Sequence, residues 1–276
     1  MAISAQDVKK LRDMTGAGMM DCKKALAEAE SDFDKAVEIL RLKGQKVAAK
    51  RADRETTEGD VFVWSNDNDS ESIAIALGCE TEPVAVNDQF KTLGETILKA
   101  AVENKPATVE ELIAIAVDGE TLEAKITDLI GKIGEKIHVA SYAHVTGEKV
   151  AAYKHGRKIA VLVELVNTDG ADVVEAGRDV AMQVAAMNPV AVSEADVDPT
   201  VIAKEKEIGR EKALQEGKPE NIVDRIADGY VKKFLKENTL LEQSFVKDPS
   251  VSVAQYLNNT QKGMTVKAFH RVSTGA

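Results

Sequence analysis

The sequence predicts an α+β protein built from several parts. Three short amphipathic helical patterns open the chain, two strand hairpins are each followed by a helix, and a mostly charged helix pair interrupts the second half. Helices that follow antiparallel hairpins, without an alternating parallel crossover pattern, indicate an α+β fold. With 276 residues and 44% hydrophobic content the chain can bury a substantial core, and its length suggests roughly two domains.

The amino-terminal segment should form a small bundle of three helices. Ser4 suits the N-cap of the first helix, and Gly16 with Gly18 marks a tight break before the second. Ser31 should cap a third helix that ends near Gly44. Each helix carries an apolar stripe at helical spacing. The stripes comprise Val8, Leu11 and Met14, then Met19, Cys22, Leu26 and Ala29, then Phe33, Ala36, Val37 and Leu40.

Two adjacent methionines follow the glycine break. Met19 lies on the apolar stripe of the second helix, so we expect it in the core. Met20 lies off the stripe, where a partner contact is at least as well supported as core packing, because methionine adapts to irregular apolar surfaces. A bundle of this size is marginally stable by itself and commonly docks on another surface.

A basic segment follows the bundle. Between residues 41 and 54, six basic residues face a single acid, Asp53. The basic residues are Arg41, Lys43, Lys46, Lys50, Arg51 and Arg54. The run is consistent either with a solvated helix face or with a patch that steers an acidic partner, and the sequence does not separate the two.

Composition excludes some classes of function. The net charge of −10 argues against nucleic-acid binding by the whole protein. The first residues show no apolar signal segment, and no apolar run is long enough to span a bilayer, so we expect a cytoplasmic protein without membrane contact. Its two cysteines, Cys22 and Cys79, fit small buried hydrophobic residues kept reduced in that compartment.

The pattern then changes to strands. Residues 61–64 and 72–80 are strand-like and flank the turn signal of residues 66–69, which predicts a hairpin. A helix over residues 87–104 follows and stops before Pro106. The same order returns at residues 150–153, 159–166 and 171–187, with a turn at 155–157. The repeat indicates a weak internal duplication of a strand, strand, helix unit.

Further elements are expected between and after these units. Residues 108–115 and 121–133 should be helical, and a strand should follow at 137–144. Pro199 suits the first turn of a helix that runs to about Glu216, and residues 217–219 separate it from a second helix. The pair should be an antiparallel hairpin that projects from the body, with the apolar anchors Val201, Ile202, Ile208 and Leu214. A short helix at 251–257 and a strand at 264–270 close the chain.

Catalytic signatures are scarce. The chain has no Gly-x-x-x-x-Gly-Lys-Ser/Thr phosphate loop, and its one Gly-x-Gly lacks the preceding strand that a dinucleotide site requires. His138 and His144 share a strand face by spacing, but no third metal ligand is in register with them. His155 beside Arg157 raises the alternative of an enzyme that acts on small phosphorylated substrates. The two residues lie in an ordinary hairpin turn, which disfavours this alternative. We therefore expect neither an enzyme nor a bound cofactor or metal.

Several motifs of this chain occur together and in a characteristic order. The most specific is Thr15-Gly16-Ala17-Gly18-Met19-Met20-Asp21-Cys22-Lys23-Lys24-Ala25-Leu26. The others occupy residues 46–51, 79–90, 132–136, 153–163, 217–219, 232–234 and 243–256. In this combination the chain resembles the bacterial elongation factor Ts family.

The resemblance implies a domain organisation. The family has an amino-terminal ubiquitin-associated-like helical domain, an α+β core of two related halves and an inserted antiparallel coiled-coil hairpin. In this sequence the first part is expected at residues 1–54, the two core halves at 55–145 and at 146–198 with 239–276, and the insertion at 199–238.

The resemblance also implies a function and a set of residues. It implies a guanine-nucleotide exchange factor that binds elongation factor Tu in its GDP-bound and nucleotide-free states, with no cofactor and no direct nucleic-acid contact. Carried over to this sequence, the partner contacts are Met19, Met20, Lys23, Arg51, Gly134 and His155. A segment that intrudes near the Mg²⁺ of the GDP site corresponds to Thr81, Glu82, Pro83 and Val84. The helical hairpin offers a surface for a homodimer.

The chain departs from the family pattern inside that segment. The pattern has aspartate and phenylalanine where this chain has Glu82 and Pro83. Glu82 keeps the carboxylate, whereas Pro83 has less apolar volume than phenylalanine and lacks an N–H. Local sequence by itself predicts a capped loop at residues 81–83 that enters the next helix. The alternative function is a module that binds a GTPase or a ribosome-associated protein without exchanging its nucleotide.

Overall fold

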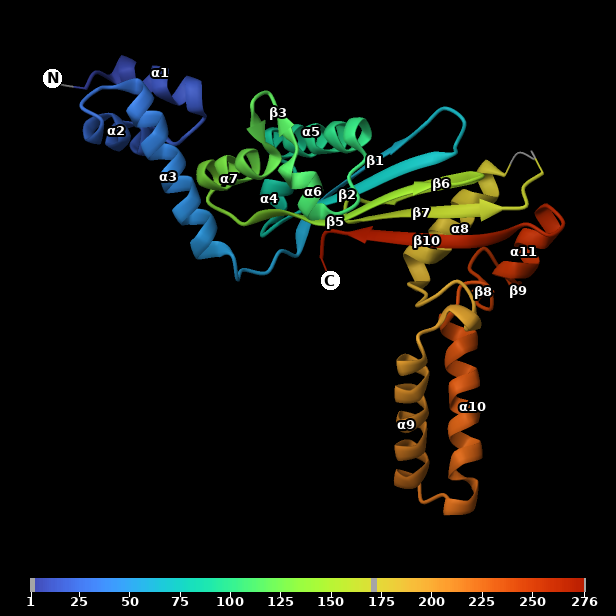
Figure 1. Ribbon diagram of the computed structural model, residues 1–276. Coiled ribbons are helices and arrows are strands. Elements are labelled where there is room, and N and C mark those ends of the chain that lie inside the picture. Colours follow the sequence, from blue (N-terminus) through green and yellow to red (C-terminus); the bar gives the residue numbers. More distant parts are fainter. Residues whose placement is uncertain (1–2, 170–172, 276) are drawn as a thin grey trace.

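The computed structural model describes residues 3–169 and 173–275. The fold is α+β, as the sequence predicts. Figure 1 shows three regions: a helical bundle at the amino terminus, a central body of sheets and helices, and a helical hairpin that projects away from the body. None of the described helices is both long enough and apolar enough to cross a membrane.

Three helices form the amino-terminal bundle: α1 (Ala5–Thr15), α2 (Met19–Glu28) and α3 (Phe33–Arg51). Ser4 caps α1 as predicted, in a capping box with Asp7. Gly16 ends α1 with a φ of 69°, a left-handed conformation that glycine adopts without strain. The core of the bundle consists of Val8, Leu11, Cys22, Ala25, Leu26, Ala29 and Ala36.

Two methionines of the predicted stripes lie outside this core. Met14 is 59% exposed and Met19 is 48% exposed, so the prediction that Met19 is buried is wrong. Both residues lie beside the glycine break, Met14 in the last turn of α1 and Met19 at the first position of α2. The core of so small a bundle does not extend to its helix ends, so apolar spacing there does not bury the side chain.

The third helix is longer than predicted. Its N-cap is Asp32 instead of Ser31, and it continues through Gly44 to Arg51. Gly44 lies against Gly131 of α7 (Leu122–Ile133), where a Cβ added to Gly131 would stand 2.7 Å from the Gly44 Cα. The glycine pair allows the two helix backbones to approach closely, so Gly44 joins the bundle to the body and does not end the helix.

The first sheet has the strand order β1–β2–β5, with antiparallel neighbours: β1 (Glu58–Ser65), β2 (Glu71–Cys79) and β5 (Ile137–Thr146). The predicted turn closes the β1–β2 hairpin, where the Asn66 side chain accepts a hydrogen bond from the Ser70 N–H at 2.9 Å. Helices α4 (Glu82–Ala85), α5 (Asp88–Asn104), α6 (Val109–Ala114) and α7 pack on this sheet. A small ribbon, β3 (Ala116–Val117) with β4 (Glu120–Thr121), joins α6 to α7.

A register shift in β5 changes which residues share a face. Leu77 pairs with Val139 but its neighbour Ala76 pairs with Ser141, so β5 holds one extra residue at this point. His138 therefore pairs with Gly78 and His144 with Ile73, and these partners lie five residues apart on β2. Because side chains alternate along a strand, the two histidines lie on opposite faces, and the prediction that they share one is wrong.

The second sheet repeats the first. Its order is β6 (Lys149–His155), β7 (Ile159–Val166) and β10 (Thr265–Ser273), with β7 in the centre and antiparallel to both neighbours. A hairpin is again followed by a helix, α8 (Val174–Met187), whose predicted start at residue 171 lies outside the described residues. Smaller elements complete this half: β8 (Ser244–Phe245), β9 (Asp248–Ser252) and α11 (Val253–Thr260).

The two sheets stack face to face through small side chains. Their shared core consists of Val61, Ala74, Ala76, Ala143, Val145, Val150, Ala160, Leu162 and Val272. The other face of the first sheet packs on α4, α5 and α7, and the other face of the second packs on α8 and α11. The body is therefore a helix, sheet, sheet, helix sandwich (Figure 1), in which the central strands β2 and β7 are almost continuously buried.

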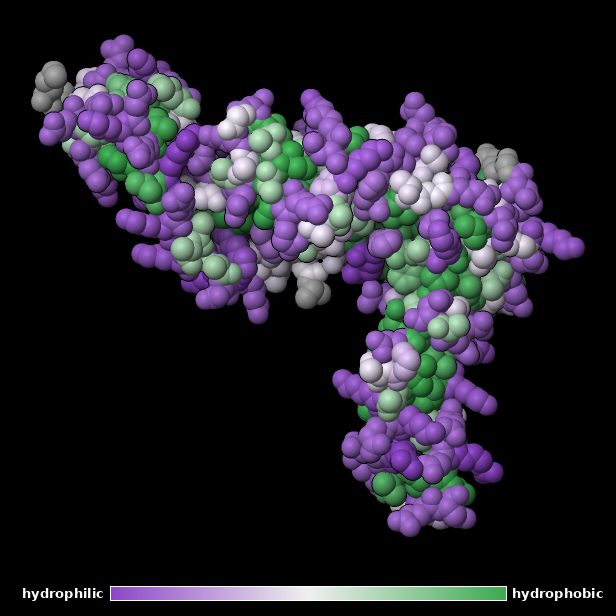
Figure 2. All heavy atoms as spheres, viewed as in Figure 1, coloured by the Kyte–Doolittle hydropathy of each residue, from purple (hydrophilic) through white to green (hydrophobic). Residues whose placement is uncertain are grey.

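The projecting hairpin consists of α9 (Pro199–Gln215) and α10 (Glu220–Asn238). The antiparallel arrangement was predicted, but Leu214 is exposed and does not anchor it. Gly209 and Ala213 are buried instead, and Gly209 brings α9 close to the backbone of α10 at Ala227. Figure 2 shows hydrophilic residues over most of the hairpin surface, with hydrophobic residues gathered between the two helices.

Candidate partner-binding surface

The amino-terminal motif builds its own turn. The Thr15 hydroxyl donates to the Leu11 carbonyl at 2.7 Å and accepts from the Ala17 N–H at 3.3 Å. The Cys22 thiol donates to the Ala17 carbonyl at 3.6 Å. Thr15, Ala17 and Cys22 therefore hold the glycine break in one shape, and this accounts for the buried cysteine without any reactive role.

The turn presents an exposed apolar and basic surface. Met20 is 63% exposed and stands beside the exposed Met19, while Lys23 follows one turn later on α2. Lys23 is exposed and forms no ion pair with another described residue. A cation beside flexible, polarizable thioethers suits contact with an irregular protein surface that carries negative charge.

The end of α3 is fixed to the body through an ion pair. Arg51 donates to both carboxylate oxygens of Glu80 at 2.8 Å, and Glu80 also accepts from the Lys136 N–H at 2.7 Å. Burial alone would raise the pKa of Glu80, but the Lys136 N–H and the Arg51 guanidinium hold it below its usual range. The Lys136 ammonium in turn donates to the carbonyls of Ala52 and Arg54, in the segment directly after α3.

The segment after Glu80 is a single helical turn, not the predicted capped loop. Glu82 and Pro83 occupy the first turn of α4, where proline is tolerated because the first N–H groups of a helix have no intrahelical partner. The Thr81 side chain does not cap this turn. Its hydroxyl and its N–H both donate to the Glu135 carboxylate, at 2.7 and 3.0 Å, so a residue of another element fixes the start of α4.

The turn exposes only part of the 81–84 segment. Thr81, Glu82 and Pro83 are exposed, whereas Val84 is 8% exposed and packs in the core beneath the first sheet. Val86 is 42% exposed and lies three residues after Pro83, on the same side of the turn. Sequence reasoning missed Val86, although the helix-start position of Pro83 followed by helical spacing would have indicated it.

The second half of the body reaches the same segment. Arg157, in the turn between β6 and β7, forms an ion pair with Glu82. His155, at the end of β6, is exposed and lies with its Nδ1 3.0 Å from the Tyr153 hydroxyl. Gly134 ends α7 with a φ of 83° next to Glu135, and a Cβ added there would meet nothing within 4 Å.

The predicted site residues therefore fall into two groups. Arg51, the 81–84 segment, Gly134 and His155 gather at one end of the two sheets, linked through Glu80, Glu135 and Arg157. Met19, Met20 and Lys23 lie apart from them on the amino-terminal bundle, which Figure 1 places beyond that same end of the body. Glu135 and Arg157 lie inside the sequence motifs, but the motifs did not indicate their pairing with Thr81 and Glu82, because each partner is distant in the chain.

The described residues offer few reactive or metal-binding groups. No group of three or more histidine, cysteine, aspartate or glutamate side chains in residues 3–169 and 173–275 is arranged to hold a metal ion. Burial, and to a smaller extent the charge of Glu135, raises the pKa of the Cys79 thiol to about 12. The features that converge at this end are exposed polar, charged and apolar groups suited to binding another macromolecule.

Comparison with known proteins identifies the family. A family model described as Elongation factor TS matches residues 80–276. The chain is 52% identical to elongation factor Ts of Amoebophilus asiaticus over 100% of both chains, and 53% identical to that of Cytophaga hutchinsonii over 98% of both. It is 49% identical to elongation factor Ts of Porphyromonas gingivalis, again over the full length of each. The chain therefore belongs to the elongation factor Ts family of translation elongation factors.

Proposed function

We propose that this chain is the guanine-nucleotide exchange factor of elongation factor Tu and acts in the cytoplasm by protein contacts alone. The observation that carries the proposal is the convergence of the exposed residues 81–83, Gly134 and the His155 turn at one end of the body. Family membership supports the identity of the partner. The amino-terminal bundle lies beyond the same end, so one partner can contact both groups of residues.

The two groups take different roles. Met19, Met20 and Lys23 hold the partner through apolar contact and charge, and Arg51 and Gly134 support the contact at the end of the body. Glu82 and Pro83 enter the partner beside the Mg²⁺ and the diphosphate of GDP. A carboxylate oxygen is a ligand that Mg²⁺ prefers, and a second negative group near the diphosphate weakens the hold of the metal on the nucleotide.

Val86 compensates for the small volume of Pro83. The family pattern places an aromatic ring in this segment, and a proline ring buries less apolar area. Pro83 and Val86 stand on one side of α4, so together they present an apolar surface next to the Glu82 carboxylate. Val84 belongs to the core and supports the turn from below.

Exchange follows from linkage between nucleotide and factor. A protein that binds nucleotide-free elongation factor Tu more tightly than the GDP-bound form must weaken the binding of GDP by the same ratio.

We also propose a domain organisation for the chain. The amino-terminal helical domain comprises residues 1–54, the two halves of the core comprise 55–145 and 146–198 with 239–276, and the helical insertion comprises 199–238. The α9–α10 hairpin of this insertion is a surface for a second copy of the chain.

The response of the complex to GDP tests this function. Immobilised chain is incubated with purified elongation factor Tu, washed, and exposed to increasing GDP. Exchange predicts that the partner is released as GDP rises, because GDP and the factor bind in competition. A complex that withstands saturating GDP contradicts exchange and supports a module that holds the GTPase without acting on its nucleotide.

A further inference from the structure

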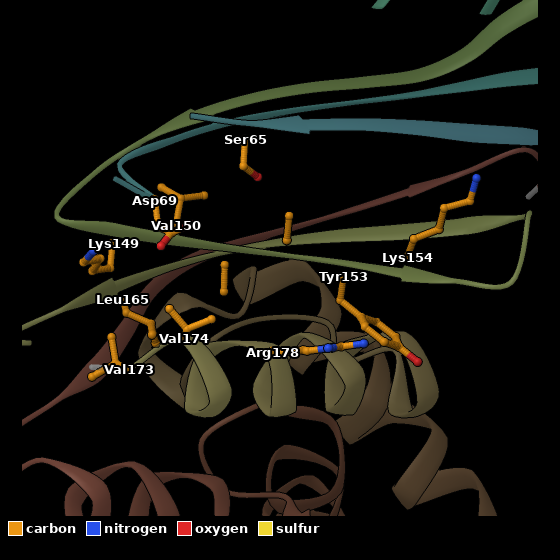
Figure 3. Close-up of a pocket in the computed structure, with 12 residues that line it drawn as sticks. Ser65, Asp69, Lys149, Val150, Tyr153, Lys154, Leu165, Val173, Val174 and Arg178 are labelled. Carbon is orange, nitrogen blue, oxygen red and sulfur yellow. The ribbon is translucent and has the colours of Figure 1, made fainter. Parts of the chain in front are cut away.

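An open strand edge borders a cavity on the second half of the body. Strand β6 is the outermost strand of its sheet. A cavity of about 350 Å³ lies along it, between α8 on one side and the tip of the β1–β2 hairpin on the other (Figure 3). Ser65 and Asp69 contribute to it from the hairpin, and Val174 and Arg178 from α8. We call this cavity the β6 groove; it is distinct from the surface around the 81–84 segment.

The backbone of β6 has unpaired groups that face this groove. The Val150 N–H does not pair with β7; it donates to the Asp69 carbonyl at 2.6 Å. Hydrogen-bonded and non-hydrogen-bonded pairs alternate along an antiparallel ladder, so Ala152 and Lys154 also direct their N–H and C=O groups away from β7. Among the described residues no other backbone group pairs with them. The contact with Asp69 shows that this edge accepts a neighbouring chain segment where one is within reach.

Side chains leave room for an added strand. Ala151 and Ala152 are small, and Ala151 faces Gly177, where a Cβ added to the glycine would stand 2.5 Å from the Ala151 Cβ. Ala151 therefore packs closely against α8, and the cavity lies beside this contact, along the residues of β6. The apolar lining of the groove consists of Val150, Ala151, Ala152, Leu165, Val173 and Val174. Five residues from Val150 to Lys154 offer about 17 Å of edge at the usual rise of an extended strand.

The charges around the groove are mostly positive. Among the described residues that line it, Lys149, Lys154 and Arg178 are basic and Asp69 is acidic. Lys154 is paired with Asp60 at 2.7 Å, whereas the Lys149 ammonium donates to the neutral Asn68 carbonyl and forms no ion pair with another described residue. Arg178, which points toward Tyr153 in Figure 3, forms no ion pair with a described residue. An excess of positive charge on a chain of net charge −10 favours an acidic ligand at this place.

We propose that the β6 groove binds an extended acidic peptide segment of a partner protein as an additional strand. The peptide backbone pairs with Ala152 and Lys154, its central apolar side chains lie against the apolar lining, and carboxylates on either side meet Lys149 and Arg178. Strand addition of this kind takes its affinity from main-chain hydrogen bonds and its specificity from the flanking side chains. Lysine on a strand edge also protects against unwanted pairing, which is the competing explanation of Lys149 and Lys154.

Fluorescence anisotropy with labelled peptides tests the proposal on the full chain. The probe is a heptapeptide with three apolar central residues and two glutamates on each side. The controls are the same peptide with lysine in place of glutamate, and the same peptide with every backbone amide methylated. We expect saturable binding of the acidic peptide alone. No saturable binding, or equal binding of the lysine peptide, would overturn the proposal. If the peptide with methylated backbone amides still binds, the groove recognises the carboxylates alone and the peptide does not add as a strand.

Two variants locate the binding. Ala152→Pro removes an N–H that points to the open edge, not one that pairs with β7, and should abolish binding. Arg178→Glu should weaken binding roughly tenfold, because it replaces an attraction by a repulsion. Arg225→Glu, the same change at an exposed position of α10, should leave binding unchanged. Equal binding by all three folded variants would contradict the assignment to this groove.

Discussion

Arg51 and Glu80 join the last turn of the amino-terminal helical region to the end of a central strand. One guanidinium nitrogen of Arg51 lies 2.8 Å from each carboxylate oxygen of Glu80, which directly precedes the 81–84 segment. The family resemblance implied a partner contact for Arg51. Its position shows that it also fixes α3 relative to the segment that we propose to enter the partner, so the two groups of proposed site residues are mechanically connected.

A double-mutant cycle measures this connection. Arg51→Ala, Glu80→Gln and the double variant should show a coupling free energy of about 1 kcal/mol, the upper range for ion pairs that keep some solvent contact. Glutamine keeps an amide oxygen that can accept from the Lys136 N–H, so the cycle reports mainly the charge attraction between Arg51 and Glu80. Urea unfolding of the four proteins provides the measurement. Strictly additive effects would show that the pair contributes no stability.

Acid should destabilise the chain partly through Glu71. Hydrogen bonds from Lys105 and His144, at 2.6 and 2.8 Å, lower the pKa of Glu71 below its ordinary value of 4.5. Its stabilising contribution is therefore complete above pH 4.5 and is lost as the pH falls through the lower, folded pKa. The unfolding free energy of Glu71→Gln should fall less between about pH 5 and pH 3 than that of the wild type. Parallel curves for the two proteins would contradict this.

Gly131→Ala should separate two helices. The new methyl group would stand 2.7 Å from the Gly44 Cα, so α3 and α7 must move apart at a cost of about 1–3 kcal/mol. Gly229→Ala is the matched control, because no atom lies within 4 Å of its added Cβ and alanine favours a helix by roughly 0.5–1 kcal/mol. Urea unfolding should give opposite signs for the two variants. A neutral effect of Gly131→Ala would show that the helices adjust freely.

Cys79 should resist alkylation in the folded protein. The thiol is buried and donates to the Thr81 carbonyl at 3.3 Å, and burial raises its pKa to about 12, so little thiolate exists near neutral pH. Iodoacetamide at pH 8 followed by mass spectrometry should label Cys79 far more slowly in native than in urea-unfolded protein. Equal labelling rates would mean that the end of β2 opens readily.

Local signals in the sequence predict most elements of this fold. Asn66 and its neighbours predict the first hairpin turn, Pro199 the start of α9, and Ser4 the start of α1. These succeed because the residues act through their own backbone conformation or through hydrogen bonds a few positions away. The duplicated hairpin and helix also follow from local patterns, repeated twice along the chain.

Several differences between the predicted and the observed structure arise from contacts between distant segments. Gly44 has the local character of a helix stop, but its function is to admit Gly131 from another helix. The register shift opposite Ala76 and Leu77 separates His138 from His144, although their spacing is that of one strand face. The pairing of Arg157 with Glu82 has no local signal in the sequence, since the two residues are 75 positions apart.

Stopped-flow fluorescence tests whether this chain is an exchange factor. Labelled GDP is released from elongation factor Tu at increasing concentrations of this chain. The wild type should accelerate release. Lys23→Ala should raise the half-saturating concentration roughly two- to fivefold with little change in maximal rate, as loss of a surface charge contact does. Glu82→Ala combined with Pro83→Gly should lower the maximal rate. An unchanged maximal rate would remove the proposed role of Glu82 and Pro83, and no acceleration by the wild type would contradict exchange itself.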